Sequence, residues 1–167
     1  SADCEFCIRA DTMKRIEGLI DVIKLCVRNA EQLTGAKADI SWGEISAERY
    51  PNRPMCQAFK DNMETLGIEM KWPDPKAQYG SSDIGNVSIK IPAIHDYLSI
   101  TDDKTIQAHT KEYADAAKSE EAQEICLKGA KGLAMTGYDI LSSDEFQAEI
   151  RRFHEQQIPD FYKEKKS

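Results

Sequence analysis

The sequence predicts an α+β fold, because two segments that alternate apolar and polar residues flank a long stretch with helical periodicity. A further strand pattern and further helical patterns follow in the C-terminal half. With 167 residues and 41% hydrophobic residues, the chain is long enough to bury one modest core. We therefore expect one domain or two small ones.

The first predicted unit is a strand, a helix and a second strand. Residues 4–9 alternate in the period-2 pattern of a half-buried strand. Apolar residues then recur every three or four positions over residues 13–33, which predicts an amphipathic helix capped by Asp11 or Thr12 and ended by Gly35. Residues 36–42 alternate again. Two strands and one helix leave sheet edges unpaired, so this layer looks incomplete.

The second half predicts more helix than strand. Pro54 suits the first turn of a helix that ends at Gly67, with Phe59 and Met63 among its core positions. Residues 87–91 alternate as in a strand, and residues 97–100 predict a short one. A helix is expected to start at Thr110 or Ser119 and to run to residue 136. The capping-box pattern of residues 142–145 predicts a last helix.

The composition argues against nucleic-acid and membrane partners. The formal net charge is −7, whereas phosphate backbones and anionic lipids select clustered Lys and Arg. No run approaches the ~18 consecutive apolar residues of a spanning helix. The five cysteines are an odd number, unlike the evenly paired framework of a small secreted domain, so we expect a cytoplasmic protein with reduced thiols.

The stretch Cys4-Glu-Phe-Cys7 has the spacing of a redox or zinc-binding pair. Residues three apart in a strand point to opposite faces, and the next predicted helix starts too late to activate a thiol. No second such pair completes a zinc site. We expect structural cysteines, and a thiol-redox protein is a minor alternative.

The three histidines are the other candidates for chemistry. His154 is expected in a solvated position on the last helix, while His95 and His109 follow strand-like segments in the half that carries a glycine-containing loop. A lone histidine is usually structural. The sequence contains no His-x-x-x-His pair and no recognisable nucleophile elbow. From the residues alone, the prediction is an α+β protein with a His-lined loop.

Several short motifs carry a family resemblance. They are Gly80-Ser-Ser-Asp83, Gly85-Asn-Val-Ser, Pro92-Ala-Ile-His95, Ala108-His-Thr-Lys-Glu-Tyr113-x-x-Ala116-Ala and Gly132-Leu-Ala-Met-Thr136. In this order and spacing they resemble the C-terminal third of the dimetal aminoacylase and carboxypeptidase-G-type amidohydrolases, in particular the branch of aminobenzoyl-glutamate hydrolases. The N-terminal half is similar to the second half of that family's inserted lid domain, and the resemblance covers residues 3 to about 155.

The resemblance implies a division of the chain and an activity. Residues 3–48 would form half of a two-layer α/β lid, and residues 49–167 would form the C-terminal strands and helices of an α/β catalytic domain. Such enzymes use two divalent metal ions of the zinc class, here zinc, manganese or cobalt, to activate a water that attacks an amide carbonyl. The implied substrate is a small amide such as an N-acyl amino acid, a dipeptide or an aminobenzoyl-glutamate.

The resemblance also assigns roles to particular residues. His109 occupies the position of a terminal metal ligand, and the turn containing Gly80 and Asp83 would lie beside the metals. His95 would face the substrate. Two further residues would hold the substrate's carboxylate, namely Arg9 and Asn52.

The sequence also departs from the family pattern. It contains neither the upstream His-x-Asp segment nor the upstream pair of adjacent Glu residues that complete a two-metal centre. The chain is therefore expected to be a C-terminal fragment that is inactive alone, and unpaired lid edges favour a homodimer. The alternative is a non-catalytic α+β interaction module that dimerises through exposed sheet edges.

Overall fold

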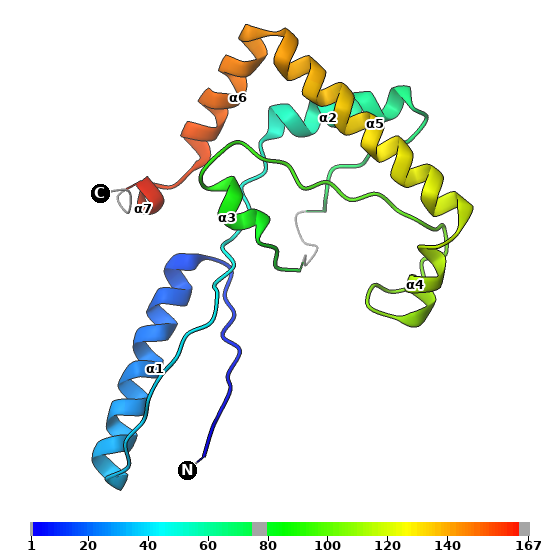
Figure 1. Ribbon diagram of the computed structural model, residues 1–167. Coiled ribbons are helices and arrows are strands. Elements are labelled where there is room, and N and C mark those ends of the chain that lie inside the picture. Colours follow the sequence, from blue (N-terminus) through cyan, green and yellow to red (C-terminus); the bar gives the residue numbers. More distant parts are fainter. Residues whose placement is uncertain (1, 75–79, 164–167) are drawn as a thin grey trace.

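The computed structural model describes residues 2–74 and 80–163, and the regular secondary structure in those ranges is helical, with extended and looped segments between the helices (Figure 1). They contain no β-strand, and the sole strand-like pairing in them is an isolated parallel bridge between Pro51 and Ala93. The prediction of an α+β fold with a strand-helix-strand lid is therefore wrong. The helices are α1 Met13–Thr34, α2 Arg53–Thr65, α3 Ile84–Ser88, α4 Lys111–Ala116, α5 Glu120–Ser142, α6 Asp144–Gln157 and α7 Asp160–Lys163.

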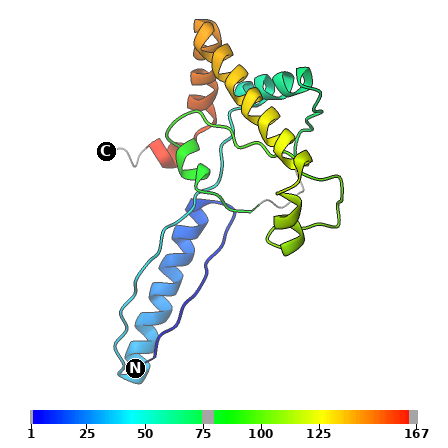
Figure 2. The ribbon, with the colours of Figure 1, turned by 45° about the vertical axis from the view of Figure 1, so that its right-hand side comes forward.

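The two segments predicted as strands around α1 are extended but unpaired. Residues 2–10 and 36–46 run alongside α1 in Figures 1 and 2, and no backbone hydrogen bond joins them. Alternation of apolar and polar residues favours an extended backbone, whereas a strand also needs a neighbour about 4.8 Å away to exchange hydrogen bonds. Among the described residues that neighbour is missing, and so are the sheet edges expected to support a dimer.

The long helix α1 forms as predicted. The Thr12 hydroxyl caps it by accepting a hydrogen bond from the Arg15 amide at 3.4 Å. At the other end, Gly35 adopts the left-handed conformation with φ 73° and donates its amide to Glu31 O at 2.9 Å. Glycine suits this position because a side chain would be strained at positive φ.

The apolar face of α1 is left largely uncovered by the described residues. Ile16, near the first turn, is the one α1 residue that is buried. Exposure increases toward the far end, from 40% at Leu19 to 87% at Leu33. Helix formation here therefore follows the sequence pattern, while the burial that usually accompanies such a pattern is confined to the base of the helix.

The main core lies between α2, α5 and α6. Met63 of α2 is fully buried, Phe59 is 3% exposed, and Ile150 of α6 is 5% exposed. Gly132 lets α5 approach α2 closely, since a Cβ there would lie 3.1 Å from the Phe59 ring and closer still to Met63 Sδ. The predicted helices of this half are confirmed, although α5 extends to Ser142 rather than to residue 136.

Thr110 and Ser119, predicted as alternative starts of one helix, each begin a separate helix. Thr110 caps the short helix α4 by accepting from the Tyr113 amide at 3.1 Å. Ser119 then caps α5 by accepting from the Ala122 amide at 3.1 Å. Two N-cap residues nine positions apart thus start two helices, which agrees with the preference for hydroxyl side chains at this position.

The segment predicted as a strand over residues 87–91 instead contains the end of the short helix α3 and the turn that follows it. The side chains of Val87 and Ile91 are 40% and 57% exposed, whereas Gly85, Ser88 and Ile89 are buried. Buried positions at i, i+3 and i+4 have the helical period. The strand prediction was wrong because this stretch satisfies both patterns, and the glycine decides which face can be buried.

Helix α3 holds the segment that connects α1 to α2. The Asn86 side chain accepts from the Ala47 amide at 2.8 Å and donates to Ile45 O at 3.0 Å. The Ser88 hydroxyl accepts from the Tyr50 amide at 3.0 Å. These bonds supply hydrogen-bond partners to a backbone that has no neighbouring strand. They fix the position from which residue 49 projects.

The Glu48 carboxylate joins three parts of the chain. It accepts from the Met13 amide at 2.9 Å, from the Tyr50 hydroxyl at 2.8 Å and from the Tyr162 hydroxyl at 2.7 Å. The Tyr50 and Tyr162 rings meet edge to face, with centroids 6.0 Å apart. Because Met13 begins α1 and Tyr162 belongs to α7, one carboxylate links the base of the long helix to the C-terminal helix.

We expect the Glu48 contacts to stabilise the protein less at low pH. Burial alone would raise the Glu48 pKa, but the bonds from Tyr162, the Met13 amide and Tyr50 together hold it below its ordinary 4.5. A carboxyl with a lowered folded-state pKa contributes stability that is complete above 4.5 and is lost as pH falls through the folded value.

The measurement is the difference in free energy of unfolding between the wild type and Glu48→Gln from about pH 7 to pH 3. The difference should favour the wild type at neutral pH and shrink toward acid. Tyr162→Phe, which removes one donor, should cost about 1 kcal/mol at neutral pH. A difference that does not change with pH would contradict the ionised role of Glu48.

None of the helices in the described part of the chain combines the length and the apolar content that crossing a bilayer requires.

Candidate functional site

Five residues from three separate segments meet beside α3, and we call them the His95 cluster. Arg49 Nη1 donates to the Tyr97 hydroxyl at 2.8 Å and lies 3.4 Å from His95 Nδ1. Arg49 Nη2 lies 3.5 Å from Gly80 O, and the Ser82 hydroxyl lies 3.4 Å from the same His95 nitrogen. Arg49 thereby contacts residues that are 31 to 48 positions away from it in the sequence.

The geometry of the cluster orients the His95 ring. Its plane stacks on the Tyr97 ring, with centroids 4.9 Å apart and planes at 28°. A guanidinium can only donate, so Nδ1 must act as the acceptor toward Arg49. The ring proton then belongs on Nε2. His95, Ser82 and Arg49 are half-buried, and Tyr97 is 59% exposed.

The neighbouring Asp96 lies in a different environment. Burial raises its pKa, while a hydrogen bond from the Cys56 thiol and the nearby His95 act to lower it. Its Oδ2 atom is buried without a hydrogen-bond partner among the described residues. Burial and the Asp96 charge raise the Cys56 pKa to about 12, which keeps this thiol protonated as a donor and unreactive at neutral pH.

The structure brings together three of the residues that the sequence singled out. His95 lies next to the turn that contains Gly80 and Asp83, and within that turn the Ser82 hydroxyl lies 3.4 Å from Asp83 Oδ1. The Asp83 side chain is exposed. His95 therefore lies beside this turn, at 3.4 Å from the Ser82 hydroxyl.

His109 and Arg9 lie outside the cluster. Among the described residues, no hydrogen bond or ring contact joins either of them to His95, and both are exposed. Arg9 lies in the extended segment before α1. His109 has φ 67° and is the one non-glycine residue of the described ranges with positive φ. Such a backbone is uncommon outside glycine and indicates a position where local geometry matters.

His154 is half-buried, unlike the solvated position expected for it. Its Nε2 lies 2.8 Å from Ser88 O, so the ring nitrogen donates to a carbonyl that can only accept. The contact holds α6 against α3. His154 therefore has a packing role among the described residues.

Cys4 and Cys7 are exposed in the extended segment before α1, and neither is in a disulfide. An extended segment offers no helix N-terminus near either thiol.

Asn52 has contacts that hold two helices together. Its side chain is fully buried, caps α2 by accepting from the Met55 amide at 3.3 Å, and donates to Ile150 O in α6 at 2.9 Å. Its own amide donates to Ala93 O at 2.9 Å. All of these partners belong to the protein backbone.

We expect Asn52→Ala to lower the free energy of unfolding by about 2 kcal/mol, because it removes both a helix cap and a buried hydrogen bond. Ser119→Ala on α5 is the matched control, since it removes a cap alone and should cost about 1 kcal/mol. Chemical denaturation measures both. Equal stability of Asn52→Ala and the wild type would contradict this structural role.

Arg49, Ser82 and Tyr97 were not predicted as site residues. Ser82 lies inside the motif Gly80-Ser-Ser-Asp83, and Tyr97 stands two residues after His95. The sequence therefore shows that both are close to the site. Arg49 has no such signal, because its position depends on the bonds between α3 and residues 45–50.

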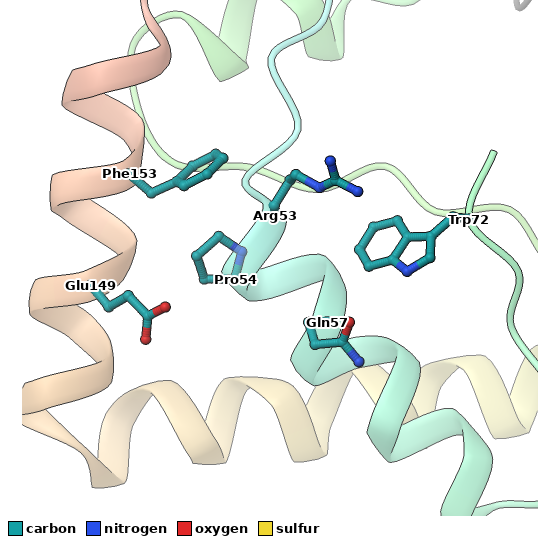
Figure 3. Close-up of a pocket in the computed structure, with 6 residues that line it drawn as sticks. All are labelled: Arg53, Pro54, Gln57, Trp72, Glu149 and Phe153. Carbon is teal, nitrogen blue, oxygen red and sulfur yellow. The ribbon is translucent and has the colours of Figure 1, made fainter. Parts of the chain in front are cut away.

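A surface pocket with a volume of ≈ 440 Å³ lies between α2 and α6 (Figure 3). The Arg53 guanidinium stands 4.7 Å above the Trp72 ring there, a cation–π contact. None of the sequence-predicted site residues lines this pocket, so its size is no argument for catalysis. Its lining consists of Arg53, Pro54, Gln57, Trp72, Glu149 and Phe153.

A smaller pocket of ≈ 230 Å³ lies in the loop on both sides of His109. Its walls come from residues 105–107 and from Thr110 and Glu112. The exposed His109 therefore stands next to a hollow of the surface. In the described residues, no group of three or more His, Cys, Asp or Glu side chains is arranged to hold a metal ion.

The sequence is similar to known proteins over most of its length. It is 36% identical over 150 residues to the Xaa-Arg dipeptidase of Mus musculus, and 36% identical over 146 residues to the Xaa-Arg dipeptidase of Homo sapiens. Each comparison covers 86% of this chain but only 34% and 33% of the relative. The chain thus spans about a third of the length of these relatives. It matches no protein-family model.

Proposed function

We propose that this chain is part of a metal-dependent dipeptidase of the amidohydrolase type. The observation that carries the proposal is the 36% identity to two Xaa-Arg dipeptidases over 86% of the chain. The proposed substrate is a dipeptide with a basic C-terminal residue. The earlier alternatives, an N-acyl amino acid and an aminobenzoyl-glutamate, have less support because neither relative carries such a name.

The backbone at His109 supports a functional role for this residue. A non-glycine residue with φ 67° is held in a conformation that costs free energy, and such residues are concentrated at functional sites. The imidazole is exposed and stands beside a pocket, so it is accessible to a ligand. We propose that His109 supplies one metal ligand in the complete enzyme.

The described residues do not by themselves fit a two-metal centre. A cocatalytic pair needs about four or five protein ligands, and no cluster of three suitable side chains exists among the described residues. Under the proposal, the remaining ligands and the general base belong to sequence that is present in the relatives and not in these 167 residues. The chain on its own is then inactive.

The test uses the protein encoded by the complete reading frame and its His109→Asn variant. Asn tolerates the left-handed backbone, so the variant removes the imidazole while keeping the local conformation. We expect the wild type to hydrolyse dipeptides that end in arginine and to lose this activity with a chelator. His109→Asn should bind less metal and lose at least about 100-fold in kcat/KM.

A His109→Gly variant separates the backbone from the side chain. It relieves the positive φ, so its free energy of unfolding should equal or exceed that of the wild type, while the activity should be lost as in His109→Asn. A complete protein that hydrolyses no dipeptide, or one in which His109→Asn leaves metal content and activity unchanged, would contradict the proposal.

A further inference from the structure

The His95 ring is constrained on two sides. One face stacks on Tyr97, and its Nδ1 edge faces both Arg49 Nη1 and Ser82 Oγ at 3.4 Å. The Arg49 backbone is positioned through α3, because residues 47 and 50 donate to Asn86 and Ser88. Both partners of the interaction are therefore held in place by the fold.

The charge of Arg49 selects one protonation form of His95. Its guanidinium stays protonated at all relevant pH values, so a proton on Nδ1 would face a fixed positive charge 3.4 Å away. The Asp96 carboxyl also interacts with His95, but burial raises the Asp96 pKa, and the Asp96 side chain accepts from Cys56. The two groups that face Nδ1 are the Arg49 guanidinium and the Ser82 hydroxyl, each at 3.4 Å, and of these Arg49 carries the charge.

From this geometry we propose that Arg49 is a positioning residue that fixes the His95 ring with Nδ1 as the acceptor and the proton on Nε2. His95 then donates a hydrogen bond to an acceptor oxygen of the ligand, and the chemical class of the ligand is an acyl compound with a carbonyl or carboxylate oxygen. The choice of an acyl compound rests on the proposed dipeptidase function. The assignment of the ring form rests only on the contacts of His95.

This role differs from that proposed for His109. A metal ligand offers an unprotonated nitrogen, whereas His95 offers an N–H group. The two histidines would therefore act on the same substrate in different ways, one through the metal and one through a direct hydrogen bond.

The experiment is long-range ¹H–¹⁵N correlation of the histidine rings in the 167-residue chain at neutral pH, because protonated and unprotonated ring nitrogens have well-separated ¹⁵N shifts. We expect His95 to show a protonated Nε2 and an unprotonated Nδ1. Arg49→Met, which removes the charge, should move His95 toward a mixture of forms, and Arg49→Lys should restore part of the wild-type pattern. A charged His95 ring or a proton on Nδ1 in the wild type would overturn the assignment.

His154 is the internal control, because its Nε2 is fixed as a donor to Ser88 O at 2.8 Å and lies outside the cluster. Its signals should not change in the Arg49 variants. If they change as much as those of His95, the variants have altered the fold, and Tyr97→Phe then serves as the milder test, since it removes the hydroxyl that holds Arg49 and keeps the stacked ring. A Tyr97→Phe protein with an unchanged His95 pattern would overturn the role of Arg49.

N-acetylarginine serves as the probe of the donor role. It should shift the His95 Nε2–H signal of the wild type and leave His154 unchanged. No shift at His95, with its ring form as expected, would overturn the donor role and keep the positioning by Arg49. These measurements need no catalytic activity, so their failure is distinct from failure of the complete enzyme to hydrolyse dipeptides.

Discussion

Replacing Gly85 with alanine is expected to lower the free energy of unfolding by about 3 kcal/mol, at the upper end of the cost of overpacking. An added Cβ would lie 2.7 Å from the Ala47 carbonyl carbon, closer still to its oxygen, and 3.2 Å from Glu48 O. These are backbone atoms and cannot rotate away as a side chain can. The segment would have to leave α3 and lose its bonds to Asn86 and Ser88.

The matched control is Gly18→Ala in the interior of α1, where an added Cβ meets nothing within 4 Å. Alanine there should stabilise the protein by about 0.5–1 kcal/mol, because glycine is the poorer helix former. Thermal or chemical denaturation of both variants gives the comparison. If Gly85→Ala were as stable as Gly18→Ala, residues 47–48 would not pack on α3 as described.

The Gly85 variant also reports on the candidate site. Arg49 follows directly after Glu48, so displacing this segment should disturb the ring form of His95 measured by ¹⁵N shifts. A variant that remains folded but shows a changed His95 signal would link the packing of α3 to the geometry of the site.

Met63→Ala should have the second large effect, a loss of about 2–5 kcal/mol. The side chain is fully buried between α2 and α5, and its sulfur packs against Gly132. Truncation to alanine removes three heavy atoms of a buried side chain and leaves a cavity that rigid helices cannot fill completely. The expected result is a lower denaturation midpoint with an unchanged helix content by circular dichroism.

Leu133→Ala, one residue after Gly132 on the same helix, is the control for Met63→Ala. Leu133 is 56% exposed, so its truncation should change the free energy of unfolding by less than about 0.5 kcal/mol. Similar losses in both variants would show that the outer face of α5 is buried in solution, for example by the remainder of a longer protein.

The helices were predictable because their signals are local. Thr12 and Gly35 at the ends of α1, and Ser143 at the start of α6, satisfy hydrogen bonds within a few residues of their own position. A sequence pattern is sufficient for such contacts. The strands failed for the converse reason, since residues 4–9 and 36–42 have the right alternation but a ladder depends on a distant partner that the described residues do not provide.

The candidate site was predictable only in part. His95 and the turn at Gly80 were found through motifs whose spacing is preserved in one continuous stretch. Arg49 was missed because it reaches His95 across 46 residues through α3, and no periodicity records such a contact. Asn52 was predicted as a substrate-binding residue, because a polar side chain that is fully buried against the neighbouring helix cannot be told from an exposed one by sequence alone.

Because α1 is attached at one end, a small rotation there produces a large displacement at the other end. The helix has 22 residues, which at 1.5 Å per residue is about 33 Å, and its hydrogen bond to Glu48 and its one buried residue lie at the base, at Met13 and Ile16. A tilt of about 10° at this base displaces the far end by about 6 Å. A shift of less than about 1 Å near Glu48 would therefore move the tip of α1 by several ångströms, whereas the His95 cluster is held by its own contacts.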